Sequence, residues 1–209
     1  FTSYNDEPVI LSGVAGTLSG GVDIRWKSHI KIRGITVTDT EMALNLDHSS
    51  YIEISHSAFD NYRLRQAWIH DNSTYNWIHD NTFSRMGSVG PPPEYNDNGA
   101  LMAIGLFLST TDYSSYNLIE NNTFYYGGHH LLEVNSPYNV IRNNYFHNEG
   151  WMDCTGDVIG GAPRPGGLCG NRDVITDSSL ATRNLFDHNA FAYAGIPSDG
   201  TEGHGFEIS

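Results

Sequence analysis

Short runs of alternating apolar and polar residues recur along the chain. Residues 30–37 (Ile-Lys-Ile-Arg-Gly-Ile-Thr-Val) and 51–55 (Tyr-Ile-Glu-Ile-Ser) follow the two-residue period of a β-strand. We find no stretch of about a dozen residues with a clean 3.6-residue period. Asn, Gly, Ser and Asp separate the runs, as is typical of turns. The pattern predicts many short strands joined by turns.

A second pattern repeats on a longer scale. An Ile or Phe, two further residues, Asn, one residue and Phe occur in this order at 78–83, 119–124, 141–146 and 186–191, and weaker copies stand at 54–59 and 32–37. Their last residues are 37, 59, 83, 124, 146 and 191, so the steps are 22, 24, 41, 22 and 45 residues. A repeat of about 22 residues with two enlarged steps indicates a solenoid, whose rungs bury their apolar faces only by stacking.

The repeated Asn and Phe predict two stacks inside this solenoid. A sharp turn between sheets favours Asn, which tolerates a left-handed backbone, and stacked Asn amides hydrogen-bond from rung to rung. We expect an Asn ladder of Asn81, Asn122, Asn144 and Asn189, with Ser57 as an earlier member. We expect an inward aromatic stack of Phe59, Phe83, Phe124, Phe146 and Phe191. Both assign a structural role to the repeat and leave the chemistry to other residues.

The motif Tyr-Asn-x-Ile-x-x-Asn-x-Phe at 75–83 and 116–124, with a near-copy at 138–146, resembles the right-handed parallel β-helix superfamily. Residues 4–13 also resemble the first coil of such proteins. The resemblance implies an all-β, right-handed, single-stranded parallel β-helix of about seven rungs with three strands each, in one domain over 1–209. Pectate lyases, alginate lyases and other polysaccharide-active proteins have this fold, as do hydrolases, epimerases and non-catalytic proteins, so the reaction stays open.

The amino-acid composition limits the classes of partner that the protein can bind. A net charge of −13 argues against nucleic acid, because phosphate binding needs Lys and Arg, and only two Lys are present. No apolar run is long enough to span a membrane. An acidic surface also repels an anionic polysaccharide unless calcium or a local Arg intervenes.

Cys154 and Cys169 enclose a 15-residue interval rich in Gly and Pro. A disulfide between them would hold that interval in place and would indicate an oxidising compartment. Two free thiols are the alternative. With the resemblance to polysaccharide-active proteins, the pair leads us to expect an extracellular protein.

The two enlarged steps predict insertions at about 84–103 and 147–171, each in the turn after the Phe strand. Two rungs separate them, so we expect them to wall a groove, since long loops on a rigid scaffold often carry function. The expected floor strands are 66–71, 105–109, 129–134 and 172–176. Counting back from the Tyr-Asn pair puts His70 and Glu133 at the same rung position.

The candidate catalytic residues on this floor are Arg172, His130, Glu133 and His70. β-Elimination of a uronate needs a base, a group that neutralises the carboxylate and an acid for the leaving group. Hydrolysis needs two carboxylates instead, for which Glu133, Asp153, Asp157 and Asp173 are candidates. The candidate substrate-binding residues are Trp151, Tyr126, His129 and Arg65. Each also has a structural interpretation: Glu133, for example, would be a solvated outward side chain.

Calcium is the one cofactor that the sequence suggests, through the oxygen ligands Asp153 and Asp157, although the dense Asp pattern of a calcium loop is missing. No tetrahedral metal set is evident despite ten His. We expect His56, His79 and His188 in the turn beside the Asn ladder, away from the groove.

The favoured function is therefore an extracellular lyase that cleaves an acidic polysaccharide in the groove between the insertions. A glycoside hydrolase on the same scaffold is one alternative. A non-catalytic carbohydrate-binding or assembly module of a larger extracellular protein is the other. Because solenoid ends expose strand edges, we expect flanking coils of a longer chain or end-to-end contacts to cover them.

Overall fold

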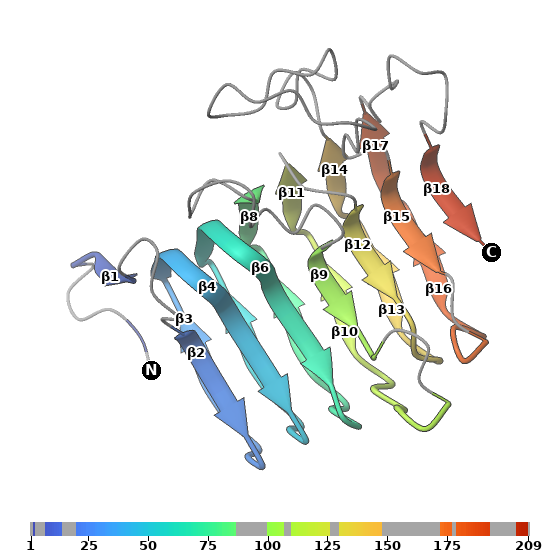
Figure 1. Cartoon of the computed structure of the whole chain (residues 1–209), viewed down its shortest axis with the longest axis horizontal. Coiled ribbons are helices and arrows are strands. Elements are labelled where there is room, and N and C mark those ends of the chain that lie inside the picture. The colour runs from blue at the N-terminus through green and yellow to red at the C-terminus, as the bar shows by residue number, and fades with distance from the viewer. Residues whose placement is uncertain are drawn as a thin grey trace.

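A computed structural model describes residues 2, 7–13, 20–86, 100–106, 110–125, 130–147, 172–176, 179–192 and 204–208, and at 62–65, 85–86, 100–101, 130, 172–176 and 204–208 it describes the backbone alone. All the regular structure in these ranges is β-strand, and every strand pairing is parallel. No helix in them is long and apolar enough to cross a membrane. The strands form a stack of coils (Figure 1).

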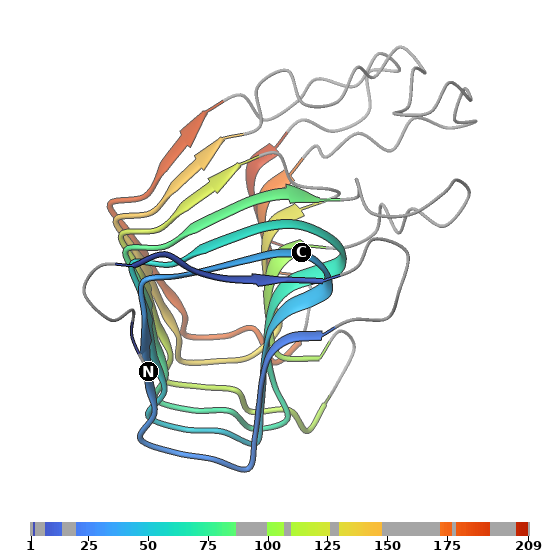
Figure 2. The same ribbon diagram turned by 90° about the vertical axis from the view of Figure 1, so that its left-hand side faces the viewer.

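Each coil has three sides, as predicted (Figure 2). The first side is a 6-stranded sheet, called sheet A. Its strands are β3 (Lys31–Arg33), β5 (Glu53–Ser55), β7 (Trp77–His79), β10 (Leu118–Glu120), β13 (Val140–Arg142) and β16 (Leu185–Asp187).

The other two sides are the legs of one 12-stranded sheet. β4 (Ile35–Asp47) and β6 (Ala58–His70) run through both legs, and the register between them shifts at Thr40 and Met42. Besides their first halves, the first leg holds β1 (Val9–Ser12), β8 (Thr82–Met86), β11 (Thr123–Tyr125), β14 (Tyr145–His147) and β17 (Ala190–Ala192). Besides their second halves, the second leg holds β2 (Gly20–Arg25), β9 (Ala100–Ile104), β12 (His130–Val134), β15 (Arg172–Thr176) and β18 (His204–Ile208). The second leg thus has one strand from each of seven coils among the described residues, in line with the predicted number of rungs.

The core is a column of inward side chains held in register by the parallel pairing. The predicted Phe stack is confirmed: its rings lie face to face along the first leg, with successive centroids 5.0, 4.9, 4.8 and 5.3 Å apart. The first four of these Phe are fully buried, whereas Phe191 at the end of the stack is 39% exposed. Offset-stacked aromatic pairs add to the free energy gained by burying their area.

The predicted Asn ladder is also confirmed. Asn81 donates both its backbone N–H and its side-chain Nδ2–H to Asn122 Oδ1, at 3.0 and 3.1 Å, and the same pattern continues to Asn144 and Asn189. The ladder Asn is not the left-handed residue, however. The positive φ belongs to the residue before it, which is His56, Asp80, Asn121, Asn143 or His188 in successive turns. That residue points out of the turn, so the ladder Asn can turn its amide inward.

A second ladder follows the Tyr-Asn pairs and was missed by the sequence analysis. It consists of Asn76, Asn117, Asn139 and Asn184. Backbone and side-chain hydrogen bonds link the first three, and Asn139 donates its backbone N–H to Asn184 Oδ1. The residue before each Asn again has positive φ, and it is Tyr75, Tyr116, Tyr138 or, before Asn184, Arg183. Tyr51, Tyr75, Tyr116 and Tyr138 stack on the outside of this turn with centroids 5.1–5.4 Å apart.

The chain enlarges between the first and second legs, where the insertions were predicted. Residues 87–99 lie between β8 and β9, and 148–171 lie between β14 and β15; both ranges are outside the described residues. The first insertion is shorter than predicted, because residues 84–86 and 100–103 belong to strands. The strand in this part of the second leg is β9, Ala100–Ile104, and not the predicted 105–109: Gly105, with a φ of 88°, lies in a bend, and 107–109 lie outside the described residues.

Candidate functional site

The outer face of the second leg carries two rows of polar and aromatic side chains. Since strands alternate, residues between the core positions of β2, β4 and β6 point outward. The first row, in register, contains Asp23, Asn45, Trp68, Ala103 and Glu133. The second row contains Arg25, Asp47 and His70. Neighbours in a row are one strand apart, about 4.8 Å.

A continuous chain of hydrogen bonds joins the two rows. Arg25 Nε lies 2.8 and 2.9 Å from the two carboxylate oxygens of Asp23. Asn45 Nδ2 donates to Asp23 Oδ1 at 2.9 Å, and its Oδ1 lies 2.8 Å from His70 Nε2. His70 Nδ1 lies 2.8 Å from Asp71 Oδ2. These hydrogen bonds connect the guanidinium of Arg25 on β2 with the carboxylate of Asp71 at the end of β6, two strands along.

The direction of these bonds places a proton on His70 Nε2. An ionised Asp23 only accepts hydrogen bonds, so Asn45 must turn its NH₂ toward Asp23 and its carbonyl toward His70. His70 Nε2 therefore donates to Asn45. Its Nδ1 faces the carboxylate of Asp71.

Asp23 is held as a carboxylate. Desolvation is the largest influence and acts to raise its pKa, but hydrogen bonds from Arg25 and Asn45 and the charges of Arg25 and His70 together lower the pKa below its usual value of 3.8. The same contact raises the pKa of the Arg25 guanidinium. The pair is stable as an ion pair at neutral pH.

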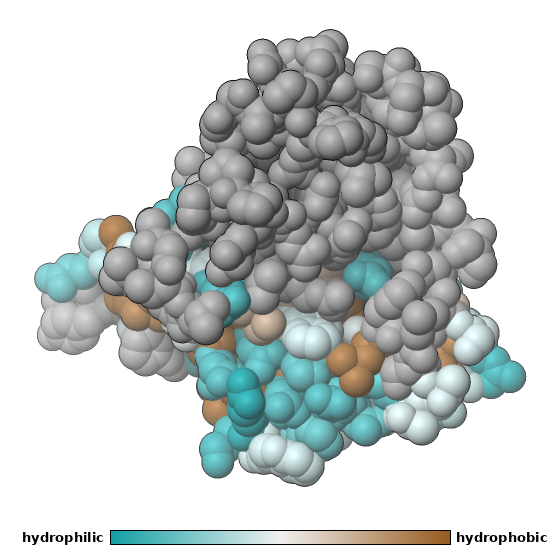
Figure 3. Space-filling view, in the orientation of Figure 1, coloured by the Kyte–Doolittle hydropathy of each residue, from teal (hydrophilic) through white to brown (hydrophobic). Residues whose placement is uncertain are grey.

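A pocket of about 230 Å³ opens over this part of the leg. Trp68 stacks on His70, with ring centroids 3.9 Å apart, and its Nε1 donates to the carbonyl of Gly105. Hydrophilic side chains gather over the lower ends of β2, β4 and β6, on the face toward the viewer in Figure 3. The lining residues are Gly20, Gly21, Val22, Asp23, Arg25, Met42, Asn45, Asp47, Trp68 and His70.

Of the predicted catalytic residues, His70 lines this pocket and Glu133 lies on the same face, two strands further along. They do not share a rung position, so that prediction is wrong. Glu133 pairs through Ala103 with Trp68. Glu133 stands five positions before Tyr138, whereas Trp68 stands seven positions before Tyr75, so a count back from the Tyr-Asn pairs misaligns the two strands by two residues.

Glu133 is also not a solvated side chain. It is 4% exposed, and Asn135 Nδ2 donates to its Oε1 at 2.7 Å. The sequence pattern did not indicate that this outward carboxylate is buried and hydrogen-bonded.

The remaining predicted residues are described in part or not at all. His130 and Arg172 begin β12 and β15, and their backbones are register partners on neighbouring coils. Arg65 lies in β6 opposite Met42. The other predicted residues lie outside the described residues: Trp151, Tyr126, His129, Asp153, Asp157, Cys154 and Cys169.

The sequence analysis missed Asp23, Arg25, Asn45 and Asp47. Their signal is the alternation at 20–25 and 42–47, which places polar residues outward on the first two strands of the leg. The predicted groove lies between the insertions, further along the stack.

Two groups of side chains in the described ranges bring metal-ligating atoms within 4.8 Å of one another. Asp47, His48 and Asp71 form one group at the rim of the pocket. His56, His79 and Asp80 form the other, where sheet A turns into the first leg. His79 was predicted in the turn, but it is the last residue of β7 and is 7% exposed.

Comparison with known proteins gives the family. No curated protein matches the sequence. Among solved structures, the chain is similar to an alginate lyase from Paenibacillus sp. str. FPU-7, with 15% sequence identity and a TM-score of 0.46, over 88% of this chain and 78% of that chain. A likeness of this degree carries no information on activity. The family model described as "Right handed beta helix region" matches residues 20–201, which is most of the chain. The protein therefore belongs to the right-handed β-helix family.

Proposed function

We propose that the protein is an extracellular lyase that cleaves an acidic polysaccharide by β-elimination on the outer face of the second leg. One observation carries the proposal. Arg25, Asp47 and His70 stand in one row on three neighbouring strands, and all three line the pocket. A cation, a carboxylate and a proton-bearing imidazole are the three groups that such an elimination needs.

Arg25 is suited to binding the uronate carboxylate. Its Nε is used by Asp23, and its Nη1 and Nη2 have no hydrogen-bond acceptor among the described residues. Two parallel N–H groups match a carboxylate in a bidentate pair. Neutralising that carboxylate stabilises the negative charge that develops when the C5 proton leaves. A local cation is also required because the protein as a whole carries a charge of −13.

Asp47 and His70 would then divide the proton transfers. The Asp47 carboxylate takes the C5 proton, the C4–O bond breaks as the C4=C5 double bond forms, and His70 gives a proton to the departing oxygen. His48 Nδ1 lies 2.6 Å from Asp47 Oδ1 and orients the carboxylate. Trp68 offers an aromatic surface for a sugar ring beside His70.

The candidate residues further along the leg are part of this proposal. Glu133, His130 and Arg172 lie on β12 and β15 of the same leg and would contact more distant sugar units. The two insertions would wall the groove, with Trp151, Tyr126, His129 and Arg65 at the substrate. Calcium at Asp153 and Asp157, a disulfide between Cys154 and Cys169, and secretion are further expectations.

The test is incubation of the purified chain with a panel of uronate polysaccharides, with and without calcium. A lyase raises ultraviolet absorbance from unsaturated sugar ends. Arg25→Gln should abolish the signal, while Arg33→Gln, the same change on the outer face of sheet A, should leave it unchanged. Lack of unsaturated product from every glycan would overturn the lyase proposal.

A glycoside hydrolase is the second candidate, because Asp23 and Asp47 place two carboxylates in the same pocket. It would release reducing ends without the ultraviolet signal. Binding of a glycan without any product, lost in Arg25→Gln, would instead identify a carbohydrate-binding module.

A further inference from the structure

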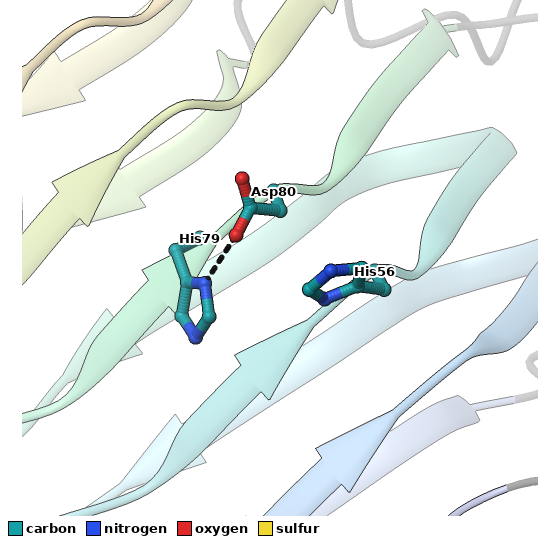
Figure 4. Close-up of side chains that lie close together, drawn as sticks. All are labelled: His56, His79 and Asp80. Carbon is teal, nitrogen blue, oxygen red and sulfur yellow. Dashed lines mark hydrogen bonds and ion pairs between the residues drawn. The ribbon is translucent and has the colours of Figure 1, made fainter.

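His56, His79 and Asp80 meet on neighbouring coils, on a different side of the coil from the pocket (Figure 4). His56 and Asp80 hold the same turn position on consecutive coils, and both have a left-handed backbone, with φ of 51° and 54°. His79 directly precedes Asp80 at the end of β7. The rings of His56 and His79 lie edge to face with centroids 6.1 Å apart. The repeat of the fold thus brings two imidazoles and a carboxylate together.

The polar ring of His79 is almost fully buried, and one of its two nitrogens has no hydrogen-bond partner among the described residues. It is 7% exposed and lies against Trp77, with ring centroids 3.8 Å apart. Its Nδ1 is 2.6 Å from Asp80 Oδ2. Its Nε2 is fully enclosed and has no hydrogen-bond partner among the described residues, and the nearest charged group is Glu53 Oε1 at 3.8 Å. Buried polar atoms without a partner are rare in native proteins and ask for an explanation.

We propose that His56, His79 and Asp80 bind a divalent transition-metal ion of the zinc class. The three donor atoms lie within 4.8 Å of one another, so small side-chain movements bring them around one ion. Two imidazoles and one carboxylate favour Zn²⁺, Co²⁺, Ni²⁺ or Cu²⁺ over Ca²⁺ or Mg²⁺, which prefer oxygen ligands.

A metal site also needs groups that hold its histidine rings in orientation, and the surroundings of His79 offer one. Metal-bound histidines usually donate their other ring N–H to a carboxylate, which fixes the ring and strengthens the ligand. With Nδ1 of His79 on the ion beside Asp80, the other ring nitrogen is Nε2, and Glu53 Oε1 at 3.8 Å is the carboxylate that can accept its N–H. Three protein ligands leave one position of a tetrahedral ion open to water or another ligand.

An ion here would join the turn after β5 to the turn after β7. It would therefore tie two successive coils together across the edge of sheet A. An ion that binds only the folded chain stabilises it, so melting should shift upward with metal concentration.

The test uses the full chain without a histidine tag, freed of metal with EDTA and dialysed. Zn²⁺ is titrated in by calorimetry, and Co²⁺ is titrated with its visible d–d absorption as the readout of a low-coordinate nitrogen site. The variants are His56→Asn and Asp80→Asn, singly and together. They should preserve the fold, because Asn121 and Asn143 occupy the same turn position on later coils.

The control is His188→Asn. His188 holds the same turn position, and its Nδ1 lies 2.6 Å from Asp187 Oδ1. We expect wild type and His188→Asn to bind one ion alike at this site, and each site variant to bind about tenfold or more weakly.

A measurement on the wild-type chain alone covers the case in which a variant fails to fold. In nitrogen-detected NMR of the imidazoles, Zn²⁺ should shift one ring nitrogen each of His56 and His79. The proposal is overturned if those signals do not move, or if the folded double variant binds Zn²⁺ and Co²⁺ as tightly as wild type.

Discussion

Asn122 Oδ1 accepts two hydrogen bonds from Asn81, one from the backbone N–H and one from the side chain. Asn122 in turn donates its own Nδ2 to the carbonyl of Ile78 and to Asn144. The Asn of each coil thus hydrogen-bonds to backbone groups of the preceding coil that are buried from water.

Asn122→Ala should therefore be strongly destabilising. It leaves the buried N–H of Asn81 without its acceptor, at about 1–3 kcal/mol, and removes the side-chain hydrogen bonds to the carbonyl of Ile78 and to Asn144. We expect the free energy of unfolding in urea to fall by at least about 2 kcal/mol. The neighbouring Asn121→Gly is the control, since Asn121 is exposed and its positive φ of 56° suits glycine. Equal losses in the two variants would show that the ladder bonds contribute little.

Phe124→Ala should remove the centre of the aromatic stack. Phe124 is fully buried, and its ring lies 4.9 Å from Phe83 and 4.8 Å from Phe146. Such a truncation costs about 3–5 kcal/mol, because the cavity adds to the lost burial. Phe191→Ala should cost clearly less, as that ring is 39% exposed at the end of the stack. Thermal or urea unfolding compares the two, and similar values would contradict the model of a closely packed stack.

Asp23 should make folding sensitive to acid. Its pKa is lower in the folded chain than in the unfolded one. The carboxylate therefore contributes stability above its unfolded pKa of about 3.8 and loses this contribution as pH falls through the lower folded value. Because Asp23 is half exposed, we expect a small effect. The stability of Asp23→Asn should vary less with pH below about 4 than that of wild type. Asp187→Asn serves as the comparison, and a wild-type slope in both variants would exclude this role for Asp23.

His70→Asn should separate catalysis from folding if the lyase proposal holds. Loss of a general acid lowers kcat by about 100-fold to 10,000-fold. The KM should change less, because Arg25 still binds the substrate carboxylate. His188→Asn removes an exposed imidazole at the edge of sheet A and should leave kcat unchanged. A wild-type kcat in His70→Asn would remove His70 from the mechanism.

Parts of the candidate site were accessible to sequence reasoning. His70 follows Trp68 and Ile69 in an alternating run, so its outward direction could be inferred, and it does line the pocket. Asp23 and Arg25 carry the same alternation. They were not predicted as site residues, because the groove was predicted at the two enlarged steps, which lie on later coils. Glu133 shows the limit: its outward phase was predicted correctly, but its burial and its bond to Asn135 depend on neighbouring chain segments.

The cluster of His56, His79 and Asp80 shows the same limit more sharply. His56 and Asp80 are 24 residues apart, and only stacking at the same turn position makes them neighbours. A metal-binding motif whose ligands are close in sequence can be recognised directly. A site whose ligands meet only because successive coils stack cannot be recognised in this way.

The sequence by itself determined the strand period, the coil length, the Asn81–Asn189 ladder and the Phe stack. These features repeat locally, so each copy supports the others, and the stack follows from the need to bury one apolar face on the next. Only the tertiary structure decided which outward residues share a row and which turns carry extra length. Glu133 is two positions nearer to its Tyr-Asn pair than Trp68 is, so an alignment counted along the chain fails, whereas hydrogen bonds between parallel strands fix the register in space.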